Sequence, residues 1–425
     1  MPTPTSELSD AKRLQSSKFQ RPEQRDRFRQ SHAGAQVRTI IIVKLFDSMP
    51  HYGGPAQAAE SSFGFLNRAD GEAWQNVRSL LESWYLDYPD RNGDLRARFR
   101  QDDERQHLAA WWELYIFVLF RQLGYQVDVH PEVEGTSKRP DFRVANDSRT
   151  FYVECTTMID YDEWTDSDHG AWVLDCINSV ENPDFMVDLT LDQAGTQRPR
   201  SREIKIPIQA WLATLDWANM SAELSADREP PTATFQFRDW VITLAAWPVL
   251  ADHRGEPGRL VGTYLVGDDQ PREDGERIRK VLAKKGSRYT EQAQPLVLAL
   301  LTSSSFVDER DVTSALFGSV AIRYFQGGKG NPPPTWIRLQ NGYWRPRSER
   351  GSRVSGVLFA NHLHKPWNPV ADLPLMYLNP WAARLLAPVP PFGARTTDDN
   401  GRLESTSPTR TAAEVLGTSG NLFDA

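Results

Sequence analysis

The segment HLAAWWELYIFVLFRQLG, residues 107–124, carries apolar side chains around all sides of a predicted helix, with Gly124 as a helix stop. A helix of this kind is buried, so other elements must cover it on every face. Glu113 is the only charged residue between Leu108 and Phe120. Because a buried carboxylate is unfavourable unless it is paired or binds a metal, we expect Glu113 either to pair with an arginine from elsewhere or to belong to a site.

The segment RPDFRVANDSRTFYVECTT, residues 139–157, predicts two strands joined by a polar turn. With the turn centred between Asp147 and Ser148, Asp141 lies directly opposite Glu154. The alternation supports this register, because it places four apolar residues together on the other face: Phe142, Val144, Phe151 and Val153. Acids opposed in this way, about 4.5–5.5 Å apart at Cβ, repel each other. Either both are solvated on an exposed face, or a divalent cation binds between them, and hard oxygen ligands suit Mg²⁺ or Mn²⁺.

Predicted helices and strands alternate along the rest of the chain. Helices are expected over 71–88, 171–181, 201–216 and 272–289, and apolar strands over 184–191, within 232–266 and over 294–304. Alternation around continuous apolar strands predicts an α/β protein with a mixed sheet whose faces are covered by helices.

The order of these features resembles the PD-(D/E)xK nuclease superfamily, which has the restriction-endonuclease-like fold. The likeness rests on an acid in the buried helix and on two strand motifs: Glu113, Pro140-Asp141 and Glu154-Cys155-Thr156. It implies that Asp141, Glu154 and the backbone carbonyl of Cys155 bind the metal, while Glu113 assists through metal or water. The chain is also similar to uncharacterised bacterial proteins built on this pattern.

One position departs from the pattern of the superfamily. The residue two after the strand glutamate is lysine in such enzymes, whereas Thr156 stands here and cannot supply a positive charge. Either the lysine comes from elsewhere in the chain, or catalysis is weak or absent. The basic helix at 272–289 is the best donor, with Lys280 and Lys284 on one face and preferred over the neighbouring Lys285.

Four residues are expected to contact substrate: Thr156 and Arg139 of the hairpin segment, and Lys285 and Tyr289 of the basic helix. Arg139 faces Thr156 in the hairpin register and could hold a phosphate, although a salt bridge to the acidic loop at 160–168 is as plausible. Cys155 points to the apolar face of the hairpin, where a small core residue is expected rather than a nucleophile.

The predicted organisation follows from this placement of the core. The expected segments are a disordered basic tail (1–38), an N-terminal helical segment (39–105), a nuclease-like core (106–183 and 268–320), an inserted α/β segment (184–267), a C-terminal extension packed on the core (321–387) and a disordered tail (388–425).

Charge and hydropathy restrict the partners. The formal net charge of −7 means that any nucleic-acid contact must use local basic patches. No apolar run is long enough to cross a bilayer, and the N-terminus lacks the apolar part of a signal peptide, so a cytoplasmic protein without a membrane partner is expected.

These features together predict a Mg²⁺- or Mn²⁺-dependent nuclease that acts on nucleic acid, DNA more readily than RNA. The alternative is a nuclease-fold module that has lost catalysis and binds nucleic acid or protein. The sequence leaves the oligomeric state open.

Overall fold

The computed structural model describes residues 43–418, apart from 135–136, 160–166, 225–228, 257, 267–273, 290–292, 305–306, 325–332, 350 and 399–400. The helices are α1 (Ser62–Arg68), α2 (Glu72–Asp87), α3 (Asp94–Phe99), α4 (Glu104–Gln122), α5 (Asp168–Asn178), α6 (Ser201–Leu212), α7 (Trp217–Leu224), α8 (Asp274–Gly286), α9 (Glu309–Phe317) and α10 (Ala412–Leu416). The strands are β1 (Gln126–Val129), β2 (Phe142–Asn146), β3 (Arg149–Met158), β4 (Phe185–Gln193), β5 (Thr232–Phe237), β6 (Trp240–Pro248), β7 (Val261–Val266), β8 (Leu296–Thr302), β9 (Val320–Arg323), β10 (Thr335–Arg338), β11 (Gly356–Ala360), β12 (Leu375–Leu378), β13 (Ala394–Thr397) and β14 (Leu403–Thr406).

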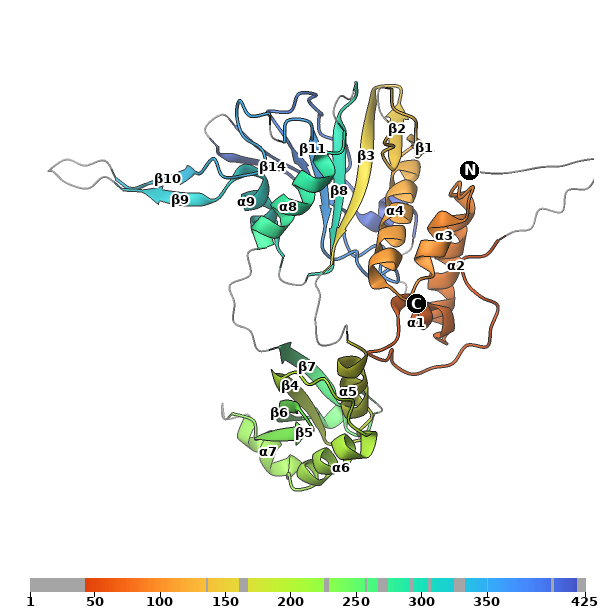
Figure 1. Ribbon diagram of the computed structural model, residues 1–425, viewed down its shortest axis with the longest axis vertical. Coiled ribbons are helices and arrows are strands. Elements are labelled where there is room, and N and C mark those ends of the chain that lie inside the picture. Colours follow the sequence, from red (N-terminus) through yellow and green to blue (C-terminus); the bar gives the residue numbers. More distant parts are fainter. Residues whose placement is uncertain are drawn as a thin grey trace, which may run out of the picture. The chain divides into compact units, whose positions relative to one another are not determined.

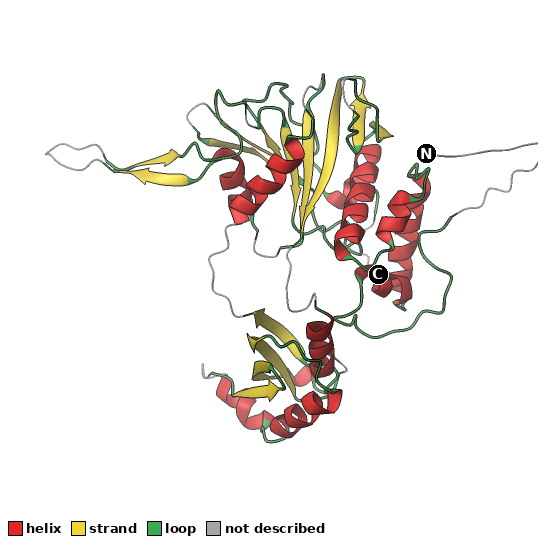
Figure 2. Ribbon diagram, in the orientation of Figure 1, coloured by secondary structure: helices red, strands yellow, loops and turns green. Residues whose placement is uncertain are grey.

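The main sheet of the described chain has eight strands in the order β1-β2-β3-β8-β11-β12-β13-β14. β3, β8 and β11 are parallel neighbours at its centre, whereas β1, β2 and β3 form antiparallel pairs on one side. Helices cover it, with α4 beside β2 and β3, and α8 and α9 beside β8 (Figure 1, Figure 2). The predicted α/β protein with a mixed sheet flanked by helices is confirmed.

Strand β8 explains how two hydrophobic layers share one sheet. Its residues Val297, Ala299 and Leu301 belong to the core that contains α4. The alternate residues belong to the second core, with Ile278 and Leu282 of α8. Because both faces are covered, the strand is an uninterrupted apolar run, as is expected of a central parallel strand.

Helix α4 is buried over most of its length, as its sequence predicts. Asp103 caps its first turn, because the side chain accepts a hydrogen bond from the backbone N–H of Arg105. Its two tryptophans also find polar partners, since Trp111 donates to the carbonyl of Leu363 and Trp112 to that of Ala299. These bonds allow the largest side chains of the helix to be fully buried.

A separate α/β unit is inserted between β3 and α8. Its four-stranded sheet has the order β5-β6-β4-β7, and α5, α6 and α7 supply helices to it. Residues of α5 such as Val173 and Ile177 pack in the core of this unit. The predicted boundary at 184 is therefore wrong, because α5 buries its apolar face against the inserted sheet. Helix α6 continues through Pro207, as expected.

The C-terminal third is part of the main sheet, so two boundaries need correction. β11 pairs in parallel with β8, and β12 pairs with β11, so residues 321–387 supply sheet strands in place of a packed extension. The segment 388–425 was expected to be disordered, but β13, β14 and α10 lie within it. Its apolar side chains join the core around α4: Val389, Phe392, Ala394, Ala412, Val415 and Leu416.

The tail at 1–38 lies outside the described residues. Within the described part, no helix has both the length and the apolar character that a bilayer crossing requires.

Candidate active site

The hairpin register that places two acids together is confirmed. Phe142 pairs with Val153, and Asn146 pairs with Arg149 at the turn, so Asp141 lies opposite Glu154. The apolar residues of the hairpin face the core around α4, and Asp141 and Glu154 therefore point to the other face. Helix α8 covers that face.

A cavity of about 190 Å³ brings together the three acids that the sequence singles out, Glu113, Asp141 and Glu154. Four basic residues line the same cavity: Arg98, Arg139, Lys285 and Arg288. Glu113 reaches it from α4, which lies on the opposite side of the sheet from α8. Elements from three parts of the sequence therefore build one polar site.

Glu154 has three partners on the segment that begins with α8. Its Oε1 accepts from Lys285 Nζ at 2.9 Å and from Arg288 Nη1 at 3.1 Å, while its Oε2 accepts from the Tyr289 hydroxyl at 2.6 Å. The carboxylate side chain is 3% exposed. Burial and the bond to Glu154 raise the pKa of the Tyr289 hydroxyl, which therefore stays protonated and donates.

The lysine beside the acids is Lys285, and the preference for Lys280 or Lys284 is wrong. Lys280 is 73% exposed and pairs with Glu276 one turn away, and Lys284 is exposed. Lys285 lies three residues after Leu282 and seven after Ile278, so it shares the buried face of α8. The face of the helix that packs on the sheet thus decides which lysine reaches Glu154.

Glu113 has the arginine partner that was expected as an alternative to a site role. Arg98 Nη2 donates to its Oε2 at 2.7 Å, and the hydroxyl of Tyr88 donates to its Oε1 at 2.5 Å. His130 Nε2 lies 3.7 Å from Oε1. Glu113 nevertheless lines the cavity, so it is both paired with an arginine and part of the site.

Asp141 differs from the other two acids, because it accepts a hydrogen bond from the backbone. The N–H of Cys155 donates to Asp141 Oδ2 at 2.6 Å. Burial and the negative charges of Glu154 and Glu113 raise the pKa of Asp141 well above its usual range. The three acids therefore interact electrostatically, and a cation placed among them would relieve the repulsion.

The remaining predicted site residues of the hairpin segment differ in their surroundings. Thr156 is buried and lines the cavity two residues after Glu154. Arg139 also lines it, but its guanidinium pairs with Glu132 at 2.6 Å, and most of the acidic loop at 160–168 lies outside the described residues. Cys155 packs in the core, as expected of a small apolar residue, and burial with nearby acids raises the pKa of its thiol.

The sequence interpretation missed Arg98, Arg288 and Tyr88. The need of buried Glu113 for a cation pointed to an arginine without identifying it. Arg288 follows Lys285 by three residues and lies in the turn just after α8 ends at Gly286, where its backbone N–H donates to the carbonyl of Lys285. Nothing in the sequence indicated that Tyr88 would bond to Glu113, apart from its place at the end of an amphipathic helix.

Two oxygen donors of the site already bind a cationic group, the ammonium of Lys285. Lys285 Nζ is shared by Glu154 Oε1 and, at 3.1 Å, by the backbone carbonyl of Cys155. These are two of the three groups that the resemblance assigns to the metal, and they already bind a positive charge. Among the described residues, no group of three or more His, Cys, Asp or Glu side chains is arranged for a metal ion. A bound ion would therefore depend on Asp141, Glu154 and this carbonyl.

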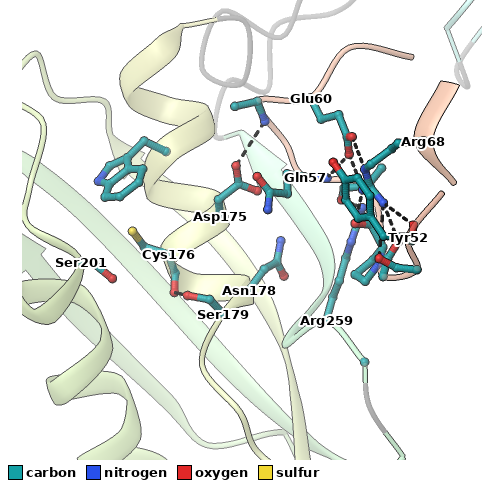
Figure 3. Close-up of a pocket in the computed structure, with 17 residues that line it drawn as sticks. Tyr52, Gln57, Glu60, Arg68, Asp175, Cys176, Asn178, Ser179, Ser201 and Arg259 are labelled. Carbon is teal, nitrogen blue, oxygen red and sulfur yellow. Dashed lines mark hydrogen bonds and ion pairs between the residues drawn. The ribbon is translucent and has the colours of Figure 1, made fainter. Parts of the chain in front are cut away.

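Two other cavities are larger than the cavity of about 190 Å³ that contains the three acids. One of about 470 Å³ adjoins the site, since Arg98, Glu113 and Arg139 line both. The other, of about 720 Å³, is shown in Figure 3. There Asp175 accepts from the backbone of Ala58 and Ala59, and Arg68 pairs with Glu60 and binds backbone carbonyls. These charged groups are bonded to the segment 52–60, which lines the cavity, and so are engaged within the protein. This cavity is therefore the weaker candidate for a functional site.

No protein-family model, no curated protein and no solved structure matches this chain.

Proposed function

We propose that the chain is a metal-dependent phosphodiesterase with a restriction-endonuclease-like core, which hydrolyses nucleic acid and prefers DNA. The observation that carries the proposal is the bond from Lys285 to Glu154. It supplies, from α8, the positive charge that Thr156 cannot supply from β3. The site thereby has the complement of two strand acids, one helix acid and one lysine that the resemblance requires.

Each residue has a role that follows from its contacts. Asp141, Glu154 and the Cys155 carbonyl would hold Mg²⁺ or Mn²⁺, which when bound polarises a phosphate and lowers the pKa of water. Lys285 stabilises negative charge that develops on the phosphate. Tyr289 holds Glu154 in place through its hydroxyl.

The cationic lining of the cavity supports a phosphodiester substrate. Arg98, Arg139 and Arg288 surround the acids together with Lys285. Arginine suits phosphate, because its planar group presents paired donors. Glu113 binds Arg98 and so positions one of these donors at the rim between the two adjoining cavities.

Substitution of the strand acids tests the proposal. Asp141→Ala and Glu154→Ala should each abolish cleavage of DNA in Mg²⁺ or Mn²⁺ while the circular dichroism spectrum stays that of the folded protein. Asp147→Ala is a matched control, since Asp147 is an exposed acid at the turn of the same hairpin. If the purified wild-type chain cleaves neither DNA nor RNA in either metal at low and moderate salt, the proposal is wrong.

One observation favours a second function, a nuclease fold without catalysis that binds nucleic acid or protein. Both oxygens of Glu154 are already engaged by Lys285, Arg288 and Tyr289. A metal must compete with these partners. Thermal unfolding in increasing Mg²⁺ or Mn²⁺ separates the two, because an intact site is stabilised by RT ln(1 + [L]/Kd) and a degenerate one is not.

A further inference from the structure

Strands β9 and β10 form a two-stranded antiparallel ribbon that projects from the main sheet beyond α9 (Figure 1). Large apolar side chains on it face solvent. Trp336 is 73% exposed, Tyr324 68% and Val320 51%. Trp336 lies directly opposite Ile322, and Val320 is two residues before Ile322, so these three share one face of the ribbon. Exposed apolar groups gathered on one face mark an interaction surface.

The charge of the segment around the ribbon favours a polyanion as its partner. From Val312 to Ser348 the described residues include four arginines and no aspartate or glutamate, although the whole chain has a net charge of −7. The arginines are Arg323, Arg338, Arg345 and Arg347. Arg323 is exposed, and no described residue forms an ion pair with it. A local basic stretch in an acidic protein is the electrostatic pattern of a nucleic-acid contact.

Hydrogen bonds hold the base of the ribbon. Arg338 donates to the carbonyl oxygens of Gly318 at 2.7 Å and Gly401 at 3.0 Å. The backbone N–H of Leu339 donates to the carbonyl of Ser319 at 2.8 Å. Helix α9, which leads into β9, packs against α8, the helix that carries Lys285. The ribbon is thus connected to the site through two packed helices.

We infer that the β9–β10 ribbon is a nucleic-acid-binding arm that enters the major groove of duplex DNA. This inference rests on the proposed function, because it takes the polyanion to be the substrate. Paired strands lie about 4.8 Å apart, and the major groove is about 12 Å wide, so a ribbon with its side chains fits there. Trp336, Tyr324 and Ile322 contact base edges and sugars from one face of the ribbon, and Arg323, which lies on the other face of β9, contacts a phosphate.

Binding can be measured without cleavage. The full chain is titrated into fluorescein-labelled duplex DNA in EDTA, and anisotropy is read at several salt concentrations. Trp336→Ala combined with Tyr324→Ala should weaken binding at least about tenfold, roughly the value of one or two good base contacts. Arg323→Gln should weaken it less and lower the salt dependence by about one phosphate contact.

A matched control separates the ribbon from exposed apolar groups in general. Leu250 of the inserted unit is also 73% exposed, and Leu250→Ala should bind like the wild type. The inference is overturned if the ribbon variants bind duplex as the wild type does, if the wild type binds no duplex, or if the loss is confined to a single-stranded probe. It is also overturned if sedimentation shows that the variants lose only self-association of the chain.

The same variants tell this inference apart from the proposed function. If the ribbon variants lose binding while the wild type cleaves nothing in Mg²⁺ or Mn²⁺, the arm stands and the nuclease proposal fails. If the wild type cleaves DNA and the ribbon variants bind and cleave equally well, the nuclease proposal stands and the arm fails.

Discussion

Replacement of Lys285 by alanine tests the arrangement of the site most directly. The substitution removes the ammonium that bonds to Glu154 at 2.9 Å and to the Cys155 carbonyl at 3.1 Å. The Lys285 side chain is 21% exposed, and that of Glu154 is 3% exposed. The ion pair is therefore shielded from water, and its loss should affect both stability and catalysis.

The expected loss of stability follows from what remains around Glu154. Removal of one partner from a buried ion pair costs about 3–5 kcal/mol when the other charge is left alone. Here Arg288 and Tyr289 keep their bonds to the carboxylate, so the loss is nearer to that of one charged hydrogen bond, about 2 kcal/mol. Lys280→Ala is the matched control, because its exposed pair with Glu276 is worth about 0.3–0.5 kcal/mol.

The assays are urea unfolding followed by circular dichroism and cleavage of plasmid DNA in Mg²⁺ or Mn²⁺. Lys285→Ala should lower the urea midpoint without a change in slope and should abolish cleavage, while Lys280→Ala and Lys284→Ala should leave cleavage near the wild-type rate. The reasoning is refuted if Lys285→Ala costs no more than Lys280→Ala, or if it cleaves while the Lys280 or Lys284 variant does not.

Three further substitutions test separate parts of the structure. Asp141→Asn should make the metal-free protein more stable than the wild type at neutral pH. Because the pKa of Asp141 is raised in the folded state, its contribution to the free energy of unfolding is complete below the unfolded pKa and is lost as pH rises through the folded pKa. Asparagine has no such loss, so the advantage of the variant in urea midpoint should shrink towards acid pH. Tyr88→Phe should cost about 1–2 kcal/mol in the same assay, because buried Glu113 loses the hydroxyl bonded at 2.5 Å and keeps Arg98. Gly318→Ala should cost more than about 2 kcal/mol, because the residue has φ +101° and a Cβ there would overlap the carbonyl oxygen of Leu339.

Each of these substitutions has an internal check. If the advantage of Asp141→Asn is the same at every pH, titration of Asp141 is not its cause. Tyr85→Phe removes a hydroxyl from a partner that is more exposed, Asp90, and should cost less than Tyr88→Phe. Gly93→Ala also changes a residue with positive φ, but no atom lies within 4 Å of the added Cβ, so it should cost about 1 kcal/mol. Equal losses for the two glycines would show that overlap at Gly318 is unimportant.

The sequence by itself determined the elements whose pattern is local. The hairpin register followed from alternation with period two, because a slip of one residue would expose Phe142 and Val153 and bury their neighbours. The burial of α4 followed from the absence of a polar face. The buried face of α8 could also be predicted from the sequence, since Ile278, Leu282 and Lys285 are spaced as one helical stripe. The i, i+4 spacing of Lys280 and Lys284 favoured the other face instead.

Only the tertiary structure decided which distant groups meet. Lys285 and Glu154 are 131 residues apart, and an inserted unit with its own core lies between them. The C-terminal segment shows the same limit, since its composition indicated disorder while β13 gains order by pairing with the edge of β12. Periodicity acts over a few residues along the chain, whereas a partner across a sheet is chosen by the burial of whole faces. For that reason the three acids of the site could be identified from the sequence, whereas Arg98 and Arg288, which pair with Glu113 and Glu154, could not.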